Sequence, residues 1–390
     1  MNSEHNTTEK SQMDAIETVD LVTHVKPGRL VSLDALRGFN MLMIIGGAQL
    51  ITGAGNLNNW RWLDWLALQQ KHARWDGFTM HDWVFPLFLF VVGVSLVFSI
   101  TSKISKGKSN KEIYLHAFKR MVLFIFIGIL YKNNPLHFDW NKIRYVSVLG
   151  RIGVTGLFVT LIWMNTTIFK QRLVCAVGIL IAYWAAMMFI PVPGFGAGNL
   201  TIEGNLAGFV DRVILPGRMI QGIYDENGPF THIPATVLVL MGAMAGELLR
   251  TRKFSQYKTV LILAGSGIGC ILLGNLWGLH FVINKHLWSS SFILVTGGLN
   301  LLVLAIFYLV IDVWGLKKWS FFLVVIGLNS LAIYIAGQFI PFQEPVDRLL
   351  NGFYQISSEP VQQFLAISGK LTLEWLVLFF LYKKRIFFKV

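Results

Sequence analysis

The stretch that most constrains the fold is DWVFPLFLFVVGVSLVFSIT, residues 82–101, in which only the first residue is charged. A run of about 20 mostly apolar residues is the length that an α-helix needs to cross the hydrocarbon core of a bilayer. The rest of the chain has the same character, since 54% of its 390 residues are hydrophobic and 14% are charged. Soluble domains carry about 25% charged residues, so we expect an integral membrane protein.

Nine other apolar segments can be drawn along the chain, and the whole set predicts an all-α, polytopic membrane protein with about ten transmembrane helices. The segment 117–131 is the weakest, because its short apolar core MVLFIFIGILY has to be extended by flanking basic residues that can reach the membrane surface. The nine segments are residues 34–53, 117–131, 146–164, 173–190, 232–249, 259–279, 289–312, 319–340 and 362–382.

The basic residues predict how the helices are oriented. Of the lysines and arginines outside the helix interiors, 22 fall on the side of the chain termini and 10 on the opposite side. Cytoplasmic loops of membrane proteins are the ones enriched in Lys and Arg, so we expect both termini in the cytoplasm. The same asymmetry accounts for the net charge of +13, and we expect no nucleic-acid partner.

The chain is expected to contain one folded unit. Residues 1–28 are polar and lack the apolar core of a signal peptide, so we expect a disordered cytoplasmic tail there. Residues 29–390 form a single transmembrane domain in this interpretation. Cys175 and Cys270 both fall inside apolar runs, which is typical of buried apolar residues rather than of a metal site or a disulfide.

Two motifs near the first two helices carry candidate functional residues, because polar groups in or beside a bilayer are costly. In SLDALRG, residues 32–38, Arg37 suits the phosphates of a cytoplasmic ligand such as CoA, or an ion pair with Asp34 on the same helix face. In KHARWDGFTMHDWVFPLFLFVVG, residues 71–93, His72 suits a general base for acetyl transfer to an amine, or an ordinary histidine at the membrane surface.

Acidic residues supply the candidates for binding a sugar, since sugar sites use carboxylates. Asp76 and Asp82 follow His72, although Asp82 could simply stabilise the start of its helix. Asp211, Arg212 and Asp225 lie in or beside a long Gly-rich loop, where they form either a sugar subsite or a self-paired surface loop. No metal-ligand spacing accompanies these residues, so we expect no metal.

A last group of candidates lies in VINKHLWSSSF, residues 282–292, and GLNSLAIYI, residues 327–335. These polar or amphipathic side chains are candidates for binding a ligand, or else serve as interfacial aromatic residues and as hydrogen bonds between helices. The chain has no phosphate-binding loop, dinucleotide fingerprint or nucleophile elbow. The residues concerned are Asn284, Lys285, Trp288, Asn329 and Ser330.

Between residues 29 and 335 the motifs SLDALRG, KHARWDGFTMHDWVFPLFLFVVG, VLGRIGVT, GFVDRV, YDENG, NKHLW and GLNSLAIY follow one another. In this set and order the chain resembles the bacterial relatives of heparan-alpha-glucosaminide N-acetyltransferase, including the bacterial membrane glucosamine N-acetyltransferases. The resemblance implies a multi-helix membrane enzyme that takes acetyl-CoA from the cytosol and delivers acetyl to a sugar amine on the far side. The family's K-H-A-x-W-x-G motif corresponds to residues 71–77, which assigns the catalytic role to His72, as a base or as an acetyl carrier.

The sequence departs from the lysosomal enzyme at two points. That enzyme has a catalytically important asparagine on the first span, where this chain has Ala48 followed by Gln49. Gln49 can supply a similar amide for binding the acceptor. We also expect no counterpart of the large N-terminal lumenal domain of the lysosomal enzyme.

We therefore expect residues 29–390 to be a transmembrane acyltransferase domain in a bacterial inner membrane, with acetyl-CoA as co-substrate, membrane lipids around it and a homodimer as a possible assembly. The acceptor is expected to be glucosamine or a glycan that contains it. Two other functions stay open: O-acylation of a cell-envelope glycan, and transport of a sugar or ion without chemistry. The residues expected to bind the donor are Arg37, Asn284, Lys285, Trp288, Asn329 and Ser330, and those expected to bind the acceptor are Gln49, Asp76, Asp82, Asp211, Arg212 and Asp225.

Overall fold

The computed structural model describes residues 30–57, 60–133 and 142–388. Regular structure in these residues is helical, apart from one isolated β-bridge between Val192 and Gly196. The predicted all-α fold is confirmed. The predicted disordered tail, residues 1–28, lies outside the described residues.

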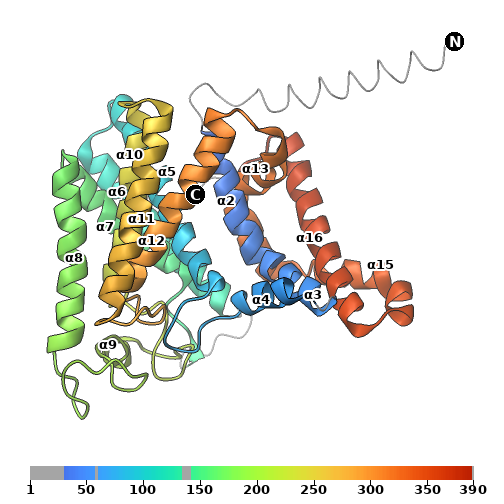
Figure 1. The fold of residues 1–390 in the computed structure, drawn as a ribbon, viewed down its shortest axis with the longest axis horizontal. Helices are drawn as coiled ribbons and strands as arrows, with labels where there is room; N and C mark the ends of the chain where they lie inside the picture. The colour runs from blue at the N-terminus through green and yellow to red at the C-terminus, as the bar shows by residue number, and fades with distance from the viewer. Residues whose placement is uncertain (1–29, 58–59, 134–141, 389–390) are drawn as a thin grey trace.

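Most of the described chain is helical, and longer loops connect several helices at the lower end of the molecule in Figure 1. Short π-helical and 3-10 segments, labelled η, continue or precede several of them. The elements are α2 Val31–Leu42, η1 Met43–Gly47, α3 Ala48–Leu57, α4 Arg61–Gln69, α5 Met80–Ser105, α6 Asn110–Lys132, α7 Val148–Asn165, α8 Phe169–Phe189, α9 Leu206–Ile214, α10 His232–Thr251, α11 Gln256–Gly278, α12 Ser290–Phe307, η3 Tyr308–Val313, η4 Lys318–Ser320, α13 Phe321–Leu328, α14 Ser330–Phe339, α15 Gln343–Ile356 and α16 Glu359–Lys383.

Within the described residues, 9 helical segments are long and apolar enough to cross a membrane, and the number rises to 10 if a bent pair counts as one span. The bent pair is α13 with α14, which meet at an angle of 58° at Asn329. Each of the ten predicted segments corresponds to one of these. The weak segment 117–131 lies within the 23-residue helix α6, which begins after a capping box formed by Ser109 and Glu112. The polytopic prediction is confirmed.

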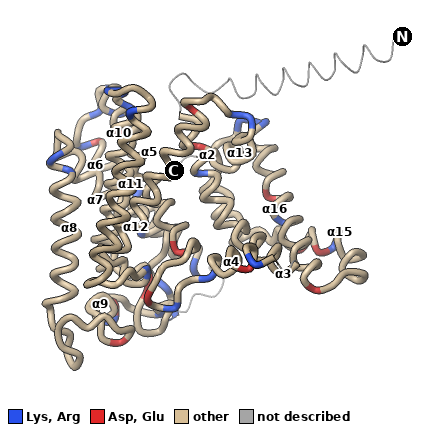
Figure 2. The backbone as a smooth tube through the Cα atoms, viewed as in Figure 1, with Lys and Arg blue, Asp and Glu red and all other residues tan. Residues whose placement is uncertain are grey.

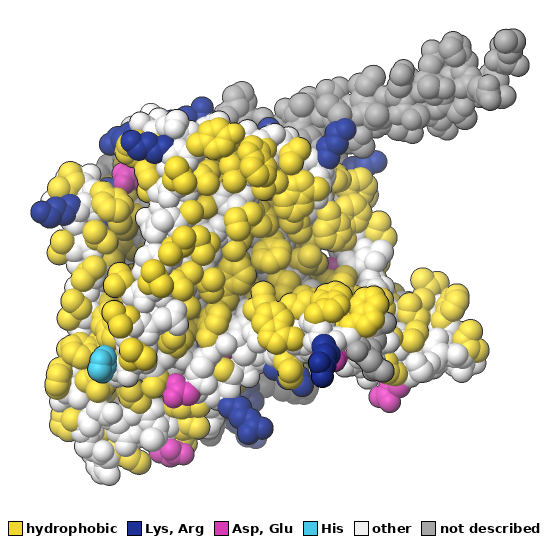
Figure 3. All heavy atoms as spheres, in the orientation of Figure 1, with side chains coloured by type: hydrophobic (Ala, Val, Ile, Leu, Met, Phe, Trp, Pro, Cys, Tyr) yellow, Lys and Arg dark blue, Asp and Glu magenta, His cyan; other side chains and the backbone are white. Residues whose placement is uncertain are grey.

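The surface fits a bilayer environment. Figure 3 shows hydrophobic side chains spread across the middle of the molecule, with Lys and Arg mainly toward its upper and lower ends. Figure 2 shows the same separation along the chain, since most charged residues lie near the ends of the helices. Apolar side chains that face lipid need no protein partner. Which end faces the cytoplasm stays a prediction from the distribution of basic residues.

Helix α5 lies at the centre of the bundle and packs along α10. The two backbones approach closely because each helix places a glycine against the backbone of the other: a Cβ on Gly93 would overlap the carbonyl oxygen of Val239, and one on Gly242 would overlap that of Phe90. Small residues at such contacts let membrane helices pack by van der Waals contact, which is a main source of their association. This contact fixes the position of α5 against α10. Helix α5 carries residues of the candidate active site and of a second site, both described below.

Replacing Gly242 by alanine should destabilise the protein, because the new methyl group has to displace the α5 backbone, and overpacking of this kind costs roughly 1–3 kcal/mol. Gly178 on α8 is the matched control, since a Cβ there meets nothing within 4 Å. Thermal unfolding in detergent should show a lower midpoint for Gly242→Ala and an unchanged or higher midpoint for Gly178→Ala. Equal midpoints for both variants would contradict the close contact.

Candidate active site

The first candidate site is built around the carboxylate of Asp82 in the first turn of α5. Its Oδ2 accepts hydrogen bonds from the backbone N–H groups of Ala73 and Thr79, both at 3.2 Å, and from the Thr79 hydroxyl at 2.9 Å. Its Oδ1 lies 2.7 Å from Nδ1 of His72. A carboxylate only accepts hydrogen bonds, so a hydrogen bond at this contact needs the proton on Nδ1 and directs Nε2 away from Asp82.

Burial differs sharply within this pair. The side chain of Asp82 is 1% exposed, whereas that of His72 is 47% exposed. A buried carboxylate with several hydrogen bonds is a rigid anchor, and the ring that it holds stays open to a ligand. The arrangement of an oriented imidazole with an accessible nitrogen is what a general base or a nucleophile requires.

Lys285 reaches the same point from the loop between α11 and α12. Its Nζ lies 3.0 Å from Nδ1 and 3.3 Å from Nε2 of His72, and 3.6 Å from Oδ1 of Asp82. The loops that carry the two residues are joined by a backbone hydrogen bond of 3.1 Å from Gly77 N to Ile283 O. The lysine side chain is buried, so its charge is balanced by carboxylates rather than by water.

Glu226 is the second of these carboxylates. It lies 3.5 Å from Nζ of Lys285 and 3.1 Å from Nδ1 of His286. Burial by itself would raise the pKa of Glu226, but the hydrogen bond with His286 and the charge of Lys285 outweigh it and lower the pKa to about 2. The His286 ring in turn stacks on Trp75 at a centroid distance of 5.3 Å. Glu226 therefore stays ionised beside the lysine.

Glu226 and His286 were not among the predicted binding residues. Both lie inside motifs that the sequence displays, YDENG and NKHLW. The available signal was the presence of charged residues in these motifs. The pairing itself could not be predicted, because Glu226 and His286 come from different loops, and the loop before α10 has to fold back onto the one before α12.

Asp211 and Asp225, predicted to bind the acceptor, lie in a buried network beside the site. Asp225 forms a bidentate ion pair with Arg144, with both N–O distances at 2.7 Å. Its backbone N–H donates to Oδ2 of Asp211 at 3.0 Å. Burial raises the pKa of Asp211 to about 7, an effect that this hydrogen bond opposes and the charge of Asp225 increases. The carboxylate of Asp225 is thus occupied by an internal partner.

The network reaches the Glu226 loop through Arg151, which is fully buried. Its Nη2 donates to the backbone oxygen of Glu226 at 2.5 Å and to the hydroxyl of Thr231. Its guanidinium lies 4.2 Å from the ring centroid of Trp288. Trp288, predicted as a donor-binding residue, is therefore a buried support for Arg151 rather than an aromatic residue at the membrane surface.

The remaining predicted acceptor residues are more peripheral. Gln49 is exposed on α3, and Asp76 is exposed in the His72 loop. Arg212 donates to the backbone oxygens of Glu203 and Ile223, at 3.0 and 3.1 Å, so it fastens its own loop. The structure thus brings Asp82 to His72, but none of these three makes a described hydrogen bond to the His72 ring.

The predicted donor residues divide into two groups. Lys285 lies beside His72. Asn284 precedes it in the same loop, and its buried Nδ2 has no hydrogen-bond partner in the described structure. Arg37 and Ser330 instead line a separate cavity of about 290 Å³, together with Ser95 and Arg120. We call this the inner cavity; its walls also include Phe88, Val91, Val92, Phe124, Ile152, Gly327, Leu328, Leu331, Phe387 and Phe388.

Asn329 is not among the residues that line the inner cavity. Its Nδ2 donates to the backbone oxygen of Ile386 at 2.9 Å, and its Oδ1 accepts from the N–H of Phe388 at 3.0 Å. These bonds hold the segment after α16 against the cavity, where Phe387 and Phe388 form part of the wall. Arg37 itself donates to the Ser95 hydroxyl at 2.7 Å.

Across the described residues, no cluster of three His, Cys, Asp or Glu side chains could hold a metal ion.

The raised pKa of Asp211 predicts a pH-dependent stability. In the folded state Asp211 keeps its proton up to about pH 7, whereas its ordinary pKa is 3.8. Its contribution to the free energy of unfolding is therefore present at low pH and is lost as the pH rises through 7. Asp211→Asn keeps the acceptor for Asp225 N–H and should remove this component. Unfolding midpoints measured from pH 5 to pH 8 should fall less in the variant than in the wild type. An unchanged slope would contradict the assignment, and Asp76→Asn is the exposed control.

Residues 29–140 match a family model described as Domain of unknown function (DUF5009). The chain is 26% identical to heparan-alpha-glucosaminide N-acetyltransferase of Mus musculus, over 93% of this chain and 60% of that protein. The enzyme of the same name from Homo sapiens is 27% identical, with the same coverage of 93% and 60%.

The chain therefore spans about 60% of the length of the curated relatives it matches. That the chain is a bacterial member of the group stays a prediction. The resemblance that the motifs predict is nevertheless confirmed, because this polytopic membrane protein is similar over most of its length to the heparan-alpha-glucosaminide N-acetyltransferases.

Proposed function

We propose that this protein is a transmembrane acetyltransferase that moves an acetyl group from cytosolic acetyl-CoA to the amine of glucosamine, or of a glycan that contains it, on the opposite side of the membrane. The observation that carries the proposal is the His72 ring, held by the buried Asp82 at 2.7 Å and yet open to a ligand. The names of the relatives, which are N-acetyltransferases acting on a glucosaminide, support the same reaction.

The position of the inner cavity supports a donor that approaches from the other end of α5. Asp82 begins that helix, and Ser95, which lines the cavity with Arg37, comes 13 residues later. At 1.5 Å per residue this is a separation of about 20 Å along the helix. An elongated donor with an anionic end suits this layout, with its anionic end at or beyond the Arg37 end of the inner cavity and its thioester directed toward His72.

The proposed chemistry needs one base and one stabilised oxyanion. The free amine attacks the thioester carbonyl carbon, the C–N bond forms, and the C–S bond breaks to release the CoA thiolate. His72 Nε2 takes the proton that the amine nitrogen loses and passes it to the thiolate, so CoA leaves as the thiol. Lys285, whose Nζ lies 3.3 Å from Nε2, stabilises the negative charge that develops on the carbonyl oxygen.

Glu226 favours an amine over a hydroxyl acceptor. Its carboxylate stays ionised, since its pKa is lowered to about 2, and it lies in the same cluster as His72. A fixed negative charge attracts the ammonium form of an amino sugar and offers nothing comparable to a neutral hydroxyl.

We further propose a bacterial inner-membrane location with both termini in the cytoplasm, contacts with membrane lipids, and a homodimer as the assembly to look for.

The first test is acetyl transfer by the purified protein from labelled acetyl-CoA to glucosamine. We expect His72→Ala to lower kcat by about 10²–10⁴-fold, the usual range for loss of a general base. The exposed His280, on the loop after α11, is the matched control, and His280→Ala should keep wild-type activity. If the wild type binds CoA but transfers no acetyl to glucosamine, that acceptor is excluded. If the wild type neither binds CoA nor transfers acetyl, the transport function is favoured.

A second test concerns the acceptor. Glu226→Gln should raise the KM for glucosamine roughly tenfold, because a hydrogen bond to a charged group is worth about that much in affinity. The KM for acetyl-CoA should change little. Steady-state kinetics with each substrate varied in turn separates the two effects. A rise confined to the KM for acetyl-CoA would contradict the role proposed for Glu226.

A further inference from the structure

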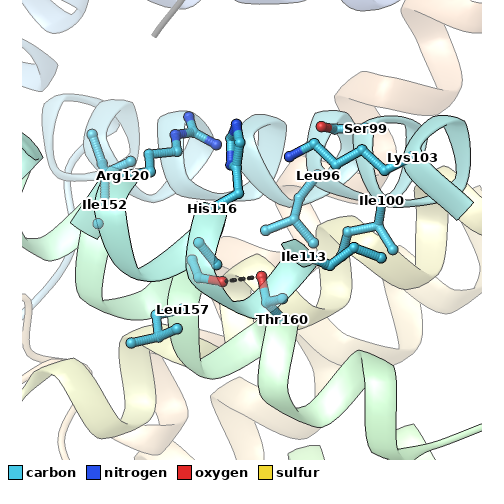
Figure 4. A pocket seen from close by; sticks show the side chains of 13 residues that line it. Leu96, Ser99, Ile100, Lys103, Ile113, His116, Arg120, Ile152, Leu157 and Thr160 are labelled. Atoms are coloured by element: carbon cyan, nitrogen blue, oxygen red, sulfur yellow. Dashed lines mark hydrogen bonds between the residues drawn. The ribbon is translucent and has the colours of Figure 1, made fainter. Parts of the chain in front are cut away.

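A second, strongly basic hollow lies at the end of α5 that is far from His72. Helix α6 packs chiefly on α7, whereas α5 packs chiefly on α10, and this leaves a small cleft between α5 and α6. We call it the α5–α6 cleft; Figure 4 shows it from close by. Its volume is about 40 Å³, and its charged lining residues are Lys103, His116 and Arg120.

The three basic side chains converge. Figure 4 shows Lys103 from α5 and His116 and Arg120 from α6 directed to the same side of the cleft, with the imidazole between the two cations. His116 and Arg120 are four residues apart, which places them on one face of α6. Like charges held together are unfavourable unless an anion balances them, and such a concave basic site attracts anionic ligands.

The surrounding side chains do not supply that anion. The lining of the cleft contains no carboxylate among the described residues. Glu112 lines the adjoining groove, but it is engaged with Nζ of Lys108 at 2.6 Å and with the backbone N–H of Ser109 at 2.9 Å. The Nε of Arg120 is buried and has no hydrogen-bond partner in the described structure. Its guanidinium lies 4.9 Å from the centroid of the Phe124 ring.

Arg120 joins the cleft to two neighbouring spaces. It lines the inner cavity of about 290 Å³ on one side, where Arg37 is a second cation. It also lines an open groove of about 410 Å³ on the other side, where Lys108 and Lys119 add further positive charge. The basic residues are therefore continuous from the outer groove to the inner cavity, whose walls are mostly apolar.

The order of these features along α5 suits one elongated ligand. Lys103 comes 21 residues after Asp82, which is about 30 Å along a helix. The inner cavity lies between them, at Phe88–Ser95. A molecule with several phosphates at one end and an uncharged arm at the other fits this order. Its phosphates would contact the basic residues, and its arm would contact the apolar walls of the inner cavity.

We propose that Lys103, His116 and Arg120 bind the phosphate groups at the nucleotide end of a CoA thioester. This assignment rests on the proposed acetyl transfer, and it deepens it by naming where the charged end of the donor is held. Arg supplies a planar fork of donors and Lys a compact charge, and both are common ligands of phosphate. The headgroup of an anionic lipid carries the same chemical group, so the test has to separate the two sources.

The test compares three ligands on two proteins. CoA carries all the phosphates, dephospho-CoA lacks the 3′-phosphate, and pantetheine lacks the whole nucleotide. Their dissociation constants are measured by calorimetry on the wild type and on the double variant Lys103→Gln/Arg120→Gln. Lys111→Gln is the matched control, because Lys111 is exposed on the first turn of α6 and lies outside the cleft lining.

The wild type should bind CoA more tightly than dephospho-CoA, and the double variant should lose affinity for CoA by roughly tenfold or more. Pantetheine should bind both proteins equally, and Lys111→Gln should behave as the wild type. Equal CoA affinity in the wild type and the double variant would overturn the inference and leave acetyl transfer standing. Absence of CoA binding to the wild type would overturn both.

The lipid source is tested in nanodiscs made of phosphatidylcholine alone or mixed with phosphatidylglycerol. If the cleft binds CoA, the loss of CoA affinity in the double variant should be the same in both membranes. If the double variant instead loses enrichment of phosphatidylglycerol around the protein, with CoA affinity unchanged, the site belongs to lipid and the CoA assignment is wrong. Matching thermal unfolding midpoints establish that the variant is folded.

Discussion

The arrangement of the candidate active site depends on one buried carboxylate. Asp82 accepts hydrogen bonds at the start of α5, holds His72 at 2.7 Å and balances the charge of Lys285 at 3.6 Å. An ionised carboxylate suits all three tasks, because its two oxygens accept from several donors and it carries the negative charge that balances a lysine. Its burial makes the geometry rigid, because a carboxylate removed from water cannot exchange these partners for solvent at low cost.

The two ends of α5 differ in how charge is balanced. Around His72 the cation of Lys285 meets the carboxylates of Asp82 and Glu226, so the cluster is internally compensated. Around Arg120 the described lining holds cations without a matching carboxylate. A compensated cluster orients groups for chemistry, whereas an uncompensated one attracts an anion. Close glycine contacts between α5 and α10 keep both ends on one rigid helix.

Several candidate residues make contacts within the protein that fix the positions of other residues. Asp225 pairs with Arg144, Arg212 fastens its loop, and Trp288 supports Arg151. Asn329 interrupts the helix between α13 and α14 and uses its amide to hold the segment after α16. Polar groups within a bilayer need partners whatever their function, so their presence in a sequence marks structural and chemical roles alike.

The sequence by itself determined the membrane character, the helical fold and the approximate positions of all ten spans, because a bilayer demands about 20 apolar residues for each crossing. It also singled out His72 and Asp82, which lie only ten residues apart. Tertiary structure alone decided that Lys285 and Glu226 join them, that Gln49 stays exposed, and that the donor candidates divide between two places. Those outcomes depend on how loops far apart in the chain fold against one another, and apolar periodicity carries no information about that.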